Sequence, residues 1–505
     1  MNHFDIIIIG SGAGGGTMAY ALADTGARVL LVERGDFVPQ EDENWNPEAV
    51  WKHLRYQTRE QWVDERGREF RPYTHYCVGG NTKFWGSVLY RMRREDFHEM
   101  QHMDGVSPAW PIDYATLERY YDRAEQLYHV RGLHGLDPTE PARHPYPYEP
   151  VPHAAGMGEI VEQLRQMGLH PSPLPLGLLR PGETDGCILC NTCNSFACKL
   201  HAKSEADIVC VRPALRRENV TLWTNACARR LHTDPSGRKV VGADIERDGR
   251  TIRVEAPLFV VSCGAINSAA LLLRSTSDRH PDGLANASGL VGRRYMAHLA
   301  TMVSAFDVRR KNTSVFQKTV AVNDFYLRGP RTTFPLGQIQ SQGRTAGVTL
   351  KSAGPWYAKD LPLAWYEWWA SGAVDWLVMS EDLPSVENRI TVDAKSRIHL
   401  RYRPNNLRAH RQLVKETQRI LRKLGLWLIV KHSLGAKNTT HQCGTVCFGT
   451  DPRTSVLDPF CRAHDVENLF VVDASFFPSS AAVNPGLTIA AQALRVADHI
   501  KDNDL

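Results

Sequence analysis

The fold of this chain of 505 residues can be predicted from one short stretch, Phe4-Asp5-Ile6-Ile7-Ile8-Ile9-Gly10-Ser11-Gly12-Ala13-Gly14-Gly15-Gly16. Its β-branched run has the length of a strand and stops at a glycine-rich turn. A helical pattern follows and closes at Gly26, which suits the position just after a helix. The run Val29-Leu30-Leu31-Val32 predicts a second buried strand. Strand, helix and strand in about 30 residues predict a crossover unit of a parallel sheet.

The glycines of this turn have the spacing of a dinucleotide-binding site. Gly10 allows a tight turn, Gly12 lets the backbone approach a pyrophosphate, and Gly15 lets the helix pack closely on the strand. The free N–H groups and positive end of the helix would then meet the phosphates. Glu33, at the end of the second strand, has about the spacing of an acid that binds a ribose hydroxyl. The first strand, the helix, the second strand and the acid together predict a bound dinucleotide.

A segment near the other end of the chain distinguishes FAD from NAD. Val471-Val472-Asp473-Ala474-Ser475 ends a buried strand, and Asn484-Pro485-Gly486-Leu487-Thr488 opens the last helix. Asn484 suits the N-cap and Pro485 the first helical position. The positive end of that helix would face a reduced flavin ring, which carries negative charge. A plain NAD domain needs no such second segment, so we expect FAD.

The order of these patterns predicts an α/β fold with two domains. Further strands at 220–223 and 258–261 extend the nucleotide-binding pattern, and 300–435 shows alternating β-type segments followed by a helix. We expect a Rossmann-like FAD-binding domain assembled from the discontinuous segments 1–95, 186–300 and 436–505. Residues 96–185 and 301–435 would form an inserted α+β substrate domain with an antiparallel sheet.

Four segments resemble the glucose–methanol–choline (GMC) oxidoreductase family: 5–33, 78–87, 260–268 and 441–500. In that family the last segment reads His-x-x-Gly-Thr, a Val-Asp-Ala-Ser strand end, and Asn-Pro-x-x-Thr. This chain has His441-Gln442-Cys443-Gly444-Thr445, then 472–475, then 484–488. The resemblance covers about half the chain. It implies a flavoenzyme that oxidises an alcohol, with the flavin accepting a hydride.

Within the family, the loop 78–86 is most similar to that of bacterial pyranose oxidases and C-glycoside oxidases. The resemblance implies oxidation of a sugar or glycoside, at a secondary ring hydroxyl that becomes a ketone. Pyranose oxidases bond FAD covalently through a histidine just before the tryptophan of this loop. Here Phe84 stands before Trp85, so we expect FAD to be held noncovalently.

The resemblance also implies two catalytic residues. Removing a proton from an alcohol requires a base whose pKa lies near the working pH, which suits histidine. His441 matches the family's base, and Asn484 matches the partner that orients the same hydroxyl. His75 and His298 also stand near predicted flavin segments, but for them we favour a structural role.

The glycine turn and the family resemblance together predict a set of cofactor contacts. These contacts are spread over the phosphates, the ring, the adenine half and the ribityl chain. The predicted residues are Gly10, Gly12, Ala13, Gly14, Gly15, Glu33, Arg34, Gly79, Gly80, Asn81, Phe84, Trp85, Gly86, Ser87, Ala228, Cys263, Gly264, Asp473, Ala474, Pro485 and Thr488.

A dense cysteine run, Cys187-x2-Cys190-x2-Cys193-x4-Cys198, resembles the start of a bacterial ferredoxin motif. That motif has three residues before its last cysteine and a proline after it, whereas Lys199 follows here. An iron–sulfur cluster or a four-thiolate zinc site is an alternative. We favour a structural loop without metal.

Aromatic residues gather in a second unusual stretch, for which we favour a core or subunit-interface role. A glycoside-binding wall ranks next and membrane-surface docking last. The members are Trp356, Tyr357, Trp365, Tyr366, Trp368, Trp369 and Trp376. Glu367 and Asp375 make 361–378 too charged to span a bilayer.

Composition narrows the partners of the protein. The net charge is +5 with scattered Lys and Arg, which gives no case for nucleic acid. We see no signal peptide and no transmembrane segment, so we expect a cytoplasmic protein. Eleven cysteines, an odd number, argue against a disulfide framework. The expected partners are a sugar or glycoside and an oxidant, either oxygen or a quinone-type acceptor. A homo-oligomer or a redox partner stays open.

Two other functions stay open at this stage. The first is a GMC dehydrogenase for a sterol or another non-sugar alcohol. The second is an electron-transfer catalytic subunit that passes electrons to a quinone or cytochrome partner through the cysteine cluster.

Overall fold

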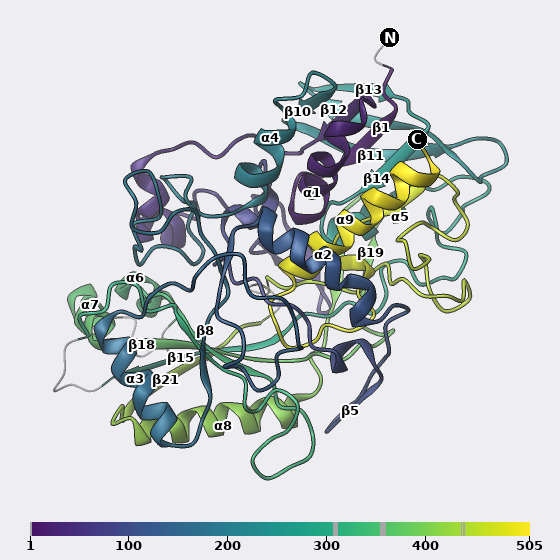
Figure 1. The fold of residues 1–505 in the computed structure, drawn as a ribbon. Helices are drawn as coiled ribbons and strands as arrows, with labels where there is room; N and C mark the ends of the chain where they lie inside the picture. The colour runs from purple at the N-terminus through teal and green to yellow at the C-terminus, as the bar shows by residue number, and fades with distance from the viewer. Residues whose placement is uncertain (1–2, 307–311, 354–359, 436, 438–439) are drawn as a thin grey trace.

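The computed structural model of the chain describes residues 3–306, 312–353, 360–435, 437 and 440–505, with the backbone alone for 352 and 353. Trp356 and Tyr357 of the aromatic stretch lie outside the described residues. Figure 1 shows two connected parts: a parallel sheet with its helices at the upper right, and an antiparallel sheet at the lower left with a long helix beneath it.

A five-stranded parallel sheet forms the centre of the upper part, in the order β10-β2-β1-β14-β22. Ile6–Ile9 (β1) pairs with Val29–Val32 (β2) on one side and with Leu258–Val261 (β14) on the other. Every residue of these three strands is buried, which explains their uninterrupted apolar runs. The outer strands are Val220–Trp223 (β10) and Leu469–Val471 (β22). The sheet therefore unites three distant pieces of the chain, and the predicted fold class is confirmed.

Helices from both ends of the chain pack beside this sheet. Ala13–Leu22 (α1) packs against Gly486–Asn503 (α9), and α9 packs in turn against Tyr114–Leu127 (α2). Gly26, with φ of +78°, ends the short turn after α1, as the sequence predicts. Ala265–Arg274 (α5) contacts a three-stranded antiparallel sheet. That sheet consists of Ala226–Thr233 (β11), Val240–Arg247 (β12) and Arg250–Val254 (β13).

The lower part is a six-stranded sheet in the order β21-β15-β18-β17-β16-β8, whose pairs are antiparallel. One of its faces packs on the amphipathic helix Leu407–Lys423 (α8) and forms a second hydrophobic core. The strands are Leu428–Ser433 (β21), Leu299–Phe306 (β15), Ala373–Ser380 (β18), Gln338–Ser341 (β17), Val320–Val322 (β16) and Pro171–Pro173 (β8).

Smaller elements connect the two parts. A four-stranded sheet has the order β19-β20-β3-β4, and two hairpin-like pairs lie outside it. Its strands are Arg389–Val392 (β19), Ile398–Arg401 (β20), Trp62–Asp64 (β3) and Glu69–Phe70 (β4). The pairs are Met100–His102 (β5) with Gly105–Ser107 (β6), and Val130–Arg131 (β7) with Leu176–Gly177 (β9). The remaining helices are Ala155–Gln166 (α3), Arg212–Ala214 (α4), Gly347–Ala353 (α6) and Leu363–Gly372 (α7).

The contacts of these elements cross the predicted boundary between the FAD-binding domain and the substrate domain. The segment 96–185, assigned above to the substrate domain, contributes β8 to the lower sheet but also α2, which packs on α9. Likewise β20, from the segment 301–435, pairs with β3 near the start of the chain. The two-domain boundaries stay a prediction, and the chain crosses between the parts more often than they imply.

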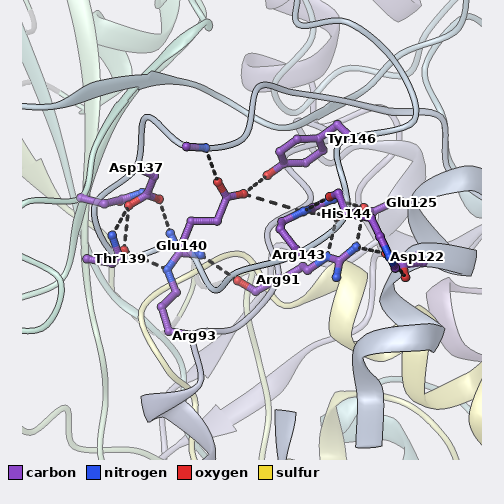
Figure 2. A network of polar contacts seen from close by, with 12 residues as sticks. Arg91, Arg93, Asp122, Glu125, Asp137, Thr139, Glu140, Arg143, His144 and Tyr146 are labelled. Atoms are coloured by element: carbon purple, nitrogen blue, oxygen red, sulfur yellow. Dashed lines mark hydrogen bonds and ion pairs between the residues drawn. The ribbon is translucent and has the colours of Figure 1, made fainter. Parts of the chain in front are cut away.

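A buried network of charges fastens α2 and the segment after it to the upper part (Figure 2). Glu125 of α2 accepts from Arg91 at 2.9 and 2.8 Å and from Arg143 at 2.7 Å. Arg93 pairs with Asp137 at 2.5 Å, and the side chains of both are at most 5% exposed. Charges so far from water are stable only when their partners stay in place. The network therefore fixes a long irregular segment, which lacks the hydrogen bonds of a sheet.

Candidate active site

A cavity of about 760 Å³ lies where the strands of the parallel sheet end. Gly10 after β1, Glu33 after β2, Ser262 after β14 and Asp473 after β22 all line it. The carboxyl ends of parallel strands are where open α/β sheets bind their ligands. The cavity continues to the lower sheet, so it is bounded by both parts of the molecule.

Three helices begin at this cavity. Ala13 opens α1, Ala265 opens α5 and Gly486 opens α9, and all three residues line the cavity. Each helix N-terminus carries partial positive charge and unpaired N–H groups. Three such ends at one cavity strongly favour a negatively charged ligand such as a pyrophosphate.

The glycine turn has the shape that a dinucleotide requires. A side chain on Gly15 would lie 1.9 Å from the Gly10 carbonyl oxygen, and one on Gly14 would lie 1.8 Å from that of Val472. Glycine at these positions therefore serves the packing of the protein itself. At Gly12 an added Cβ would meet no atom within 4 Å. The space beside Gly12 is open, so the backbone here leaves room for a pyrophosphate to approach.

Glu33 stands at the end of β2 as predicted, and protein donors already bind it. Its carboxylate accepts from the Ser11 N–H at 3.1 Å, the Ser11 hydroxyl at 2.6 Å and the Gly35 N–H at 3.1 Å. Burial raises the pKa of Glu33, and these donors act against the rise. Arg34, which also lines the cavity, pairs with Glu60 at 3.0 Å and lies over the ring of Tyr76.

Buried lysines clamp the loop from Gly79 to Ser87. Lys83 pairs with Glu205 at 2.6 Å and with Asp207 at 2.5 Å, all fully buried. Lys203 donates to the Trp85 carbonyl at 3.0 Å. Lys318 donates to the Gly86 carbonyl, and burial lowers its pKa to about 8. The loop is held rigid at the cavity wall, which suits a surface that positions a flat ring.

His441 lines the cavity and forms a hydrogen-bonded pair with His298 behind it. Their Nδ1 atoms lie 2.8 Å apart, and His298 Nε2 lies 3.0 Å from the carbonyl oxygen of Ser480. Burial lowers the pKa of both imidazoles, and for His441 the charges of His298 and Lys318 add to the effect. Both rings are therefore neutral near pH 7, with one proton each.

The Ser480 carbonyl fixes where those protons sit. A carbonyl oxygen can only accept, so His298 carries its proton on Nε2 and its Nδ1 accepts. His441 must then donate through Nδ1, which leaves its Nε2 without a proton. His441 lines the cavity, so this nitrogen can take a proton from a ligand. The sequence favoured a structural role for His298, whereas the structure places it in direct contact with the predicted base.

Asn484 lies beside the start of α9, but it is not the N-cap that the sequence predicts. The helix begins at Gly486, and the cap residue is Pro485 in a helical conformation with no side-chain cap bond. The Asn484 side chain is thus released from the backbone. Its Oδ1 is buried without a hydrogen-bond partner, and the residue lines the cavity. An unpaired buried oxygen of this kind is available to a ligand.

Most of the predicted cofactor contacts gather at the cavity. Three do not line it: Gly15 packs on Gly10, the Gly79 N–H donates to the Ser11 hydroxyl at 3.0 Å, and the Thr488 hydroxyl lies 2.8 Å from that of Tyr121. The predicted residues that line the cavity are Gly10, Gly12, Ala13, Gly14, Glu33, Arg34, Gly80, Asn81, Phe84, Trp85, Gly86, Ser87, Ala228, Cys263, Gly264, Asp473, Ala474 and Pro485.

Two further surfaces of the cavity were missed by the sequence reasoning. One is the loop 191–196, which follows two cysteines and attracted attention only as a metal candidate. The other is one face of the lower sheet, including Gln340 and Asp375. Alternating polar and apolar residues give such a strand two faces, but they do not say which face meets a cavity.

The cysteine run lies next to the cavity as separate thiols. All 11 cysteines are free, and Cys187 is buried whereas Cys190, Cys193 and Cys198 are partly buried. Burial raises the pKa of Cys187 to about 12. Among the residues that the structure describes, no three His, Cys, Asp or Glu side chains are grouped so as to hold a metal ion. The structural role of this run stays a prediction.

The described members of the aromatic stretch divide between core and surface. Trp376 on β18 is 2% exposed and belongs to the core beneath the lower sheet. Trp369 packs on Phe306 with ring centroids 4.2 Å apart. Trp365 and Trp368 on α7 keep 59% and 54% of their surface exposed. Within the described part of the stretch, none of these tryptophans lines the cavity.

Comparison with known families gives a match along most of the chain. Residues 4–300 match the N-terminal model of the GMC oxidoreductases, and residues 384–493 match the C-terminal model. These ranges include the glycine turn, His441 and Asn484. They leave out 301–383, which holds most of the lower sheet.

Individual proteins agree with this match. The chain is 32% identical to paromamine 6'-oxidase of Streptomyces fradiae, over 98% of this chain and 90% of that protein. It is 29% identical to the fructose dehydrogenase large subunit of Gluconobacter japonicus, over 99% and 98%. A variant of Aspergillus oryzae formate oxidase, studied for its FAD modification, has the same fold, with a TM-score of 0.69 and 15% identity over 99% of this chain and 98% of that chain.

Proposed function

The chain belongs to the GMC oxidoreductase family, and we propose that it oxidises a ring hydroxyl of a sugar or glycoside to a ketone. As a GMC oxidoreductase it is an enzyme that acts on CH–OH groups and binds FAD. The observation that carries the proposal is the neutral His441 with its free Nε2 in the FAD cavity. The relatives named for paromamine and fructose support a sugar-type substrate.

His441 supplies the proton-accepting atom of the mechanism. Its Nε2 takes the proton of the substrate hydroxyl, while its Nδ1–H stays bonded to His298. The resulting positive charge is stabilised through that bond, since the Nδ1 of His298 and the carbonyl of Ser480 both accept. FAD bound in the cavity supplies the hydride acceptor.

Asn484 orients the hydroxyl for this proton transfer. Its unpaired Oδ1 and its amide N–H groups flank the cavity at the start of α9. An amide so placed holds the alcohol oxygen in one direction, so that its proton points at His441 and its C–H bond points elsewhere. Because the O–H and C–H bonds of the substrate are oriented on binding, the entropy cost of orienting them does not add to the barrier of the reaction.

The cofactor contacts support noncovalent FAD. Phe84 is buried and stacks on His75 with ring centroids 3.9 Å apart. His75 is in turn bonded to Asn81, with 3.2 Å between Nδ1 and Oδ1, and burial lowers its pKa to about 4. A phenylalanine cannot bond covalently to the flavin, and the neighbouring histidine is already engaged. We expect acid precipitation of the protein to release all of the yellow cofactor into solution.

The second candidate keeps the same chemistry and passes electrons to a partner. The name of one relative, the fructose dehydrogenase large subunit, favours an acceptor other than oxygen. No helix among the described residues is long and apolar enough to cross a bilayer.

Flavin reduction without air tests the proposal directly. Purified protein is mixed with glycosides, sterols and simple alcohols, and the flavin absorbance near 450 nm is followed. We expect bleaching by a glycoside or sugar, and bleaching that is slower by about 10²–10⁴-fold when His441 is replaced by alanine. Bleaching by non-sugar alcohols alone would contradict the sugar assignment. Admitting oxygen or a quinone afterwards then distinguishes an oxidase from a dehydrogenase.

A further inference from the structure

The wall of the cavity opposite the glycine turn is one face of the lower sheet. In antiparallel strands, residues that pair across the sheet project from the same face. Met302 on β15 pairs with His432 on β21 and with Leu377 on β18. Leu377 pairs with Gln340 on β17. This row of four residues lines the cavity.

A second row lies two residues further along each strand. Ser304 on β15 pairs with Val430 on β21 and with Asp375 on β18. The N–H of Gln342, just beyond β17, donates to the carbonyl of Asp375 at 2.7 Å. These four residues line the cavity as well. The two rows form a continuous patch on one side of the sheet, which we call the substrate wall.

The substrate wall is partly polar, whereas the opposite face of the same strands is mostly apolar. Val303, Trp376 and Val378 alternate with the wall residues and pack in the core against α8. Packing in this core therefore does not explain the polar side chains on the other face. Their position at the cavity explains them, because a ligand there can form hydrogen bonds with them.

Three members of the substrate wall carry buried polar atoms without partners. Both atoms of the Gln340 side-chain amide, Oδ1 of Asp375 and the Ser304 hydroxyl have no hydrogen-bond partner, although all three residues are buried. Unsatisfied groups of this kind cost about 1–3 kcal/mol each, and more when charged. Sites that bond their ligand through such groups reject analogues that lack the matching group.

Asp375 is the acidic member of the wall. Burial raises the pKa of its carboxyl group, while polar neighbours and the charge of Arg344 act against the rise. Its Oδ2 accepts from the Thr345 N–H at 2.5 Å, and its other oxygen stays open. Among the described residues no Lys, Arg or His forms an ion pair with it. Four Lys or Arg side chains line the same cavity, but Lys318 is already bonded to Gly86 and Asn194. The other three are Arg34, which pairs with Glu60, Arg274, and Arg344 at the edge of the wall.

We propose that the open oxygen of Asp375 binds a protonated amine of the substrate, so that the preferred substrates are amino sugars or aminoglycosides. This inference rests on the proposed function. An ammonium group supplies both the charge and the donor that the buried carboxylate lacks, and charge-assisted bonds are about twice as strong as neutral ones. Gln340, with a free donor and a free acceptor, holds a neighbouring hydroxyl of the ring.

A matched substrate pair tests the inference. Methyl 2-amino-2-deoxyglucoside and methyl glucoside differ in one amine, and paromamine offers a larger amine-bearing substrate. Anaerobic flavin reduction gives a rate constant and an apparent Kd for each. We expect the wild-type protein to favour the amine-bearing sugars by about 10- to 100-fold. In Asp375→Asn the preference falls to near one, mainly through weaker binding.

The controls separate binding from folding. Asp375→Asn keeps the size of the side chain and an oxygen that accepts from Thr345, and its FAD absorbance and Tm should match the wild type. Glu162→Gln removes a negative charge from the exposed face of α3 and should leave the preference unchanged. Gln340→Leu should weaken the binding of amine-bearing and neutral sugars equally.

Two results would overturn the inference. In the first, both sugars reduce the flavin with no preference for the amine, and the proposed function still stands. In the second, Asp375→Asn weakens both sugars to the same extent. Failure of every sugar, with or without an amine, to reduce the flavin would contradict the proposed function as well as the inference.

Discussion

A histidine acts as a base only while one ring nitrogen is free of its proton. In this protein the carbonyl of Ser480 sets the proton of His298, and His298 sets that of His441. In the proposed mechanism no reorganisation is needed at the moment of reaction, because the ring is already held in the reactive tautomer. Two histidines far apart in sequence thus act as one unit.

The pH dependence follows from the burial of His441. Its pKa lies well below the ordinary value of 6.5, so the neutral base is present above that lowered pKa and is lost as the pH falls through it. We expect the acid limb of kcat/KM to lie below pH 6.5. His441→Ala should remove the limb and slow flavin reduction by about 10²–10⁴-fold. Stopped-flow reduction between pH 4 and 8 checks both, and an acid limb above pH 7 would be inconsistent with the buried pair.

His298 is expected to act as a positioning residue. His298→Leu removes the acceptor that holds the Nδ1 proton of His441, so we expect flavin reduction to slow by about 10- to 100-fold, less than for loss of the base itself. His298→Asn offers an amide oxygen near the same place and should recover part of the rate. The acid limb should move in His298→Leu, because protonated His441 loses the acceptor for its Nδ1 proton. Equal rates and unchanged pH profiles for both variants would show that His298 only fills space.

At the level of secondary-structure elements, the glycine turn contains glycines with two different roles, packing of the protein and space for a ligand, which the sequence motif does not distinguish. Gly15 is needed by the protein, since its neighbour is the backbone of Gly10, whereas Gly12 faces open space. A phosphate can approach the helix N-terminus only if residue 12 has no side chain. The helix can pack on the strand only if residue 15 has none.

Alanine substitutions should distinguish these two glycines. Gly12→Ala should fold with an unchanged apoprotein Tm but bind FAD at least about 10-fold more weakly, because its methyl group occupies the approach to the pyrophosphate. Gly15→Ala should lower the Tm or prevent folding, because its Cβ would lie 1.9 Å from a carbonyl oxygen. Fluorescence titration with FAD and thermal unfolding measure the two effects. A loss of stability in Gly12→Ala would mean that its space is not open.

At the scale of the whole molecule, buried charges join segments that the sheets leave apart. Glu125 holds Arg91 and Arg143, and it lies on the helix that packs on α9. The network therefore helps to hold α2 against α9, the helix that begins just after Asn484 at the cavity.

Removing one partner of the network should destabilise the molecule. Glu125→Gln leaves two buried guanidinium groups with a neutral neighbour, and such losses cost about 3–5 kcal/mol. We expect a lower Tm and earlier release of FAD on heating, followed by flavin fluorescence. Asp498→Asn is a matched control, because its pair with Arg123 is partly exposed and should contribute less than about 1 kcal/mol. Similar losses in both variants would argue against a special role for the buried network.

The nucleotide-binding half could be predicted from sequence because its signals are local. Strand, glycine turn, helix and acid follow one another within about 30 residues, and each constrains the backbone directly. The GMC motifs added His441 and Asn484 in the same way. Asn484 was misjudged as a helix cap, since Asn before Pro is a common helix start and the helix here begins two residues later.

The fold class and the cofactor followed from the sequence alone, which also predicted His441 as the base. The contact between His298 and His441, 143 residues apart, and the position of Gln340 and Asp375 at the cavity became visible only in the folded molecule. Asp375 had appeared only as a charge against a membrane span. The reason is physical: periodicity gives each strand two faces, whereas the face that meets the cavity depends on how distant segments pack.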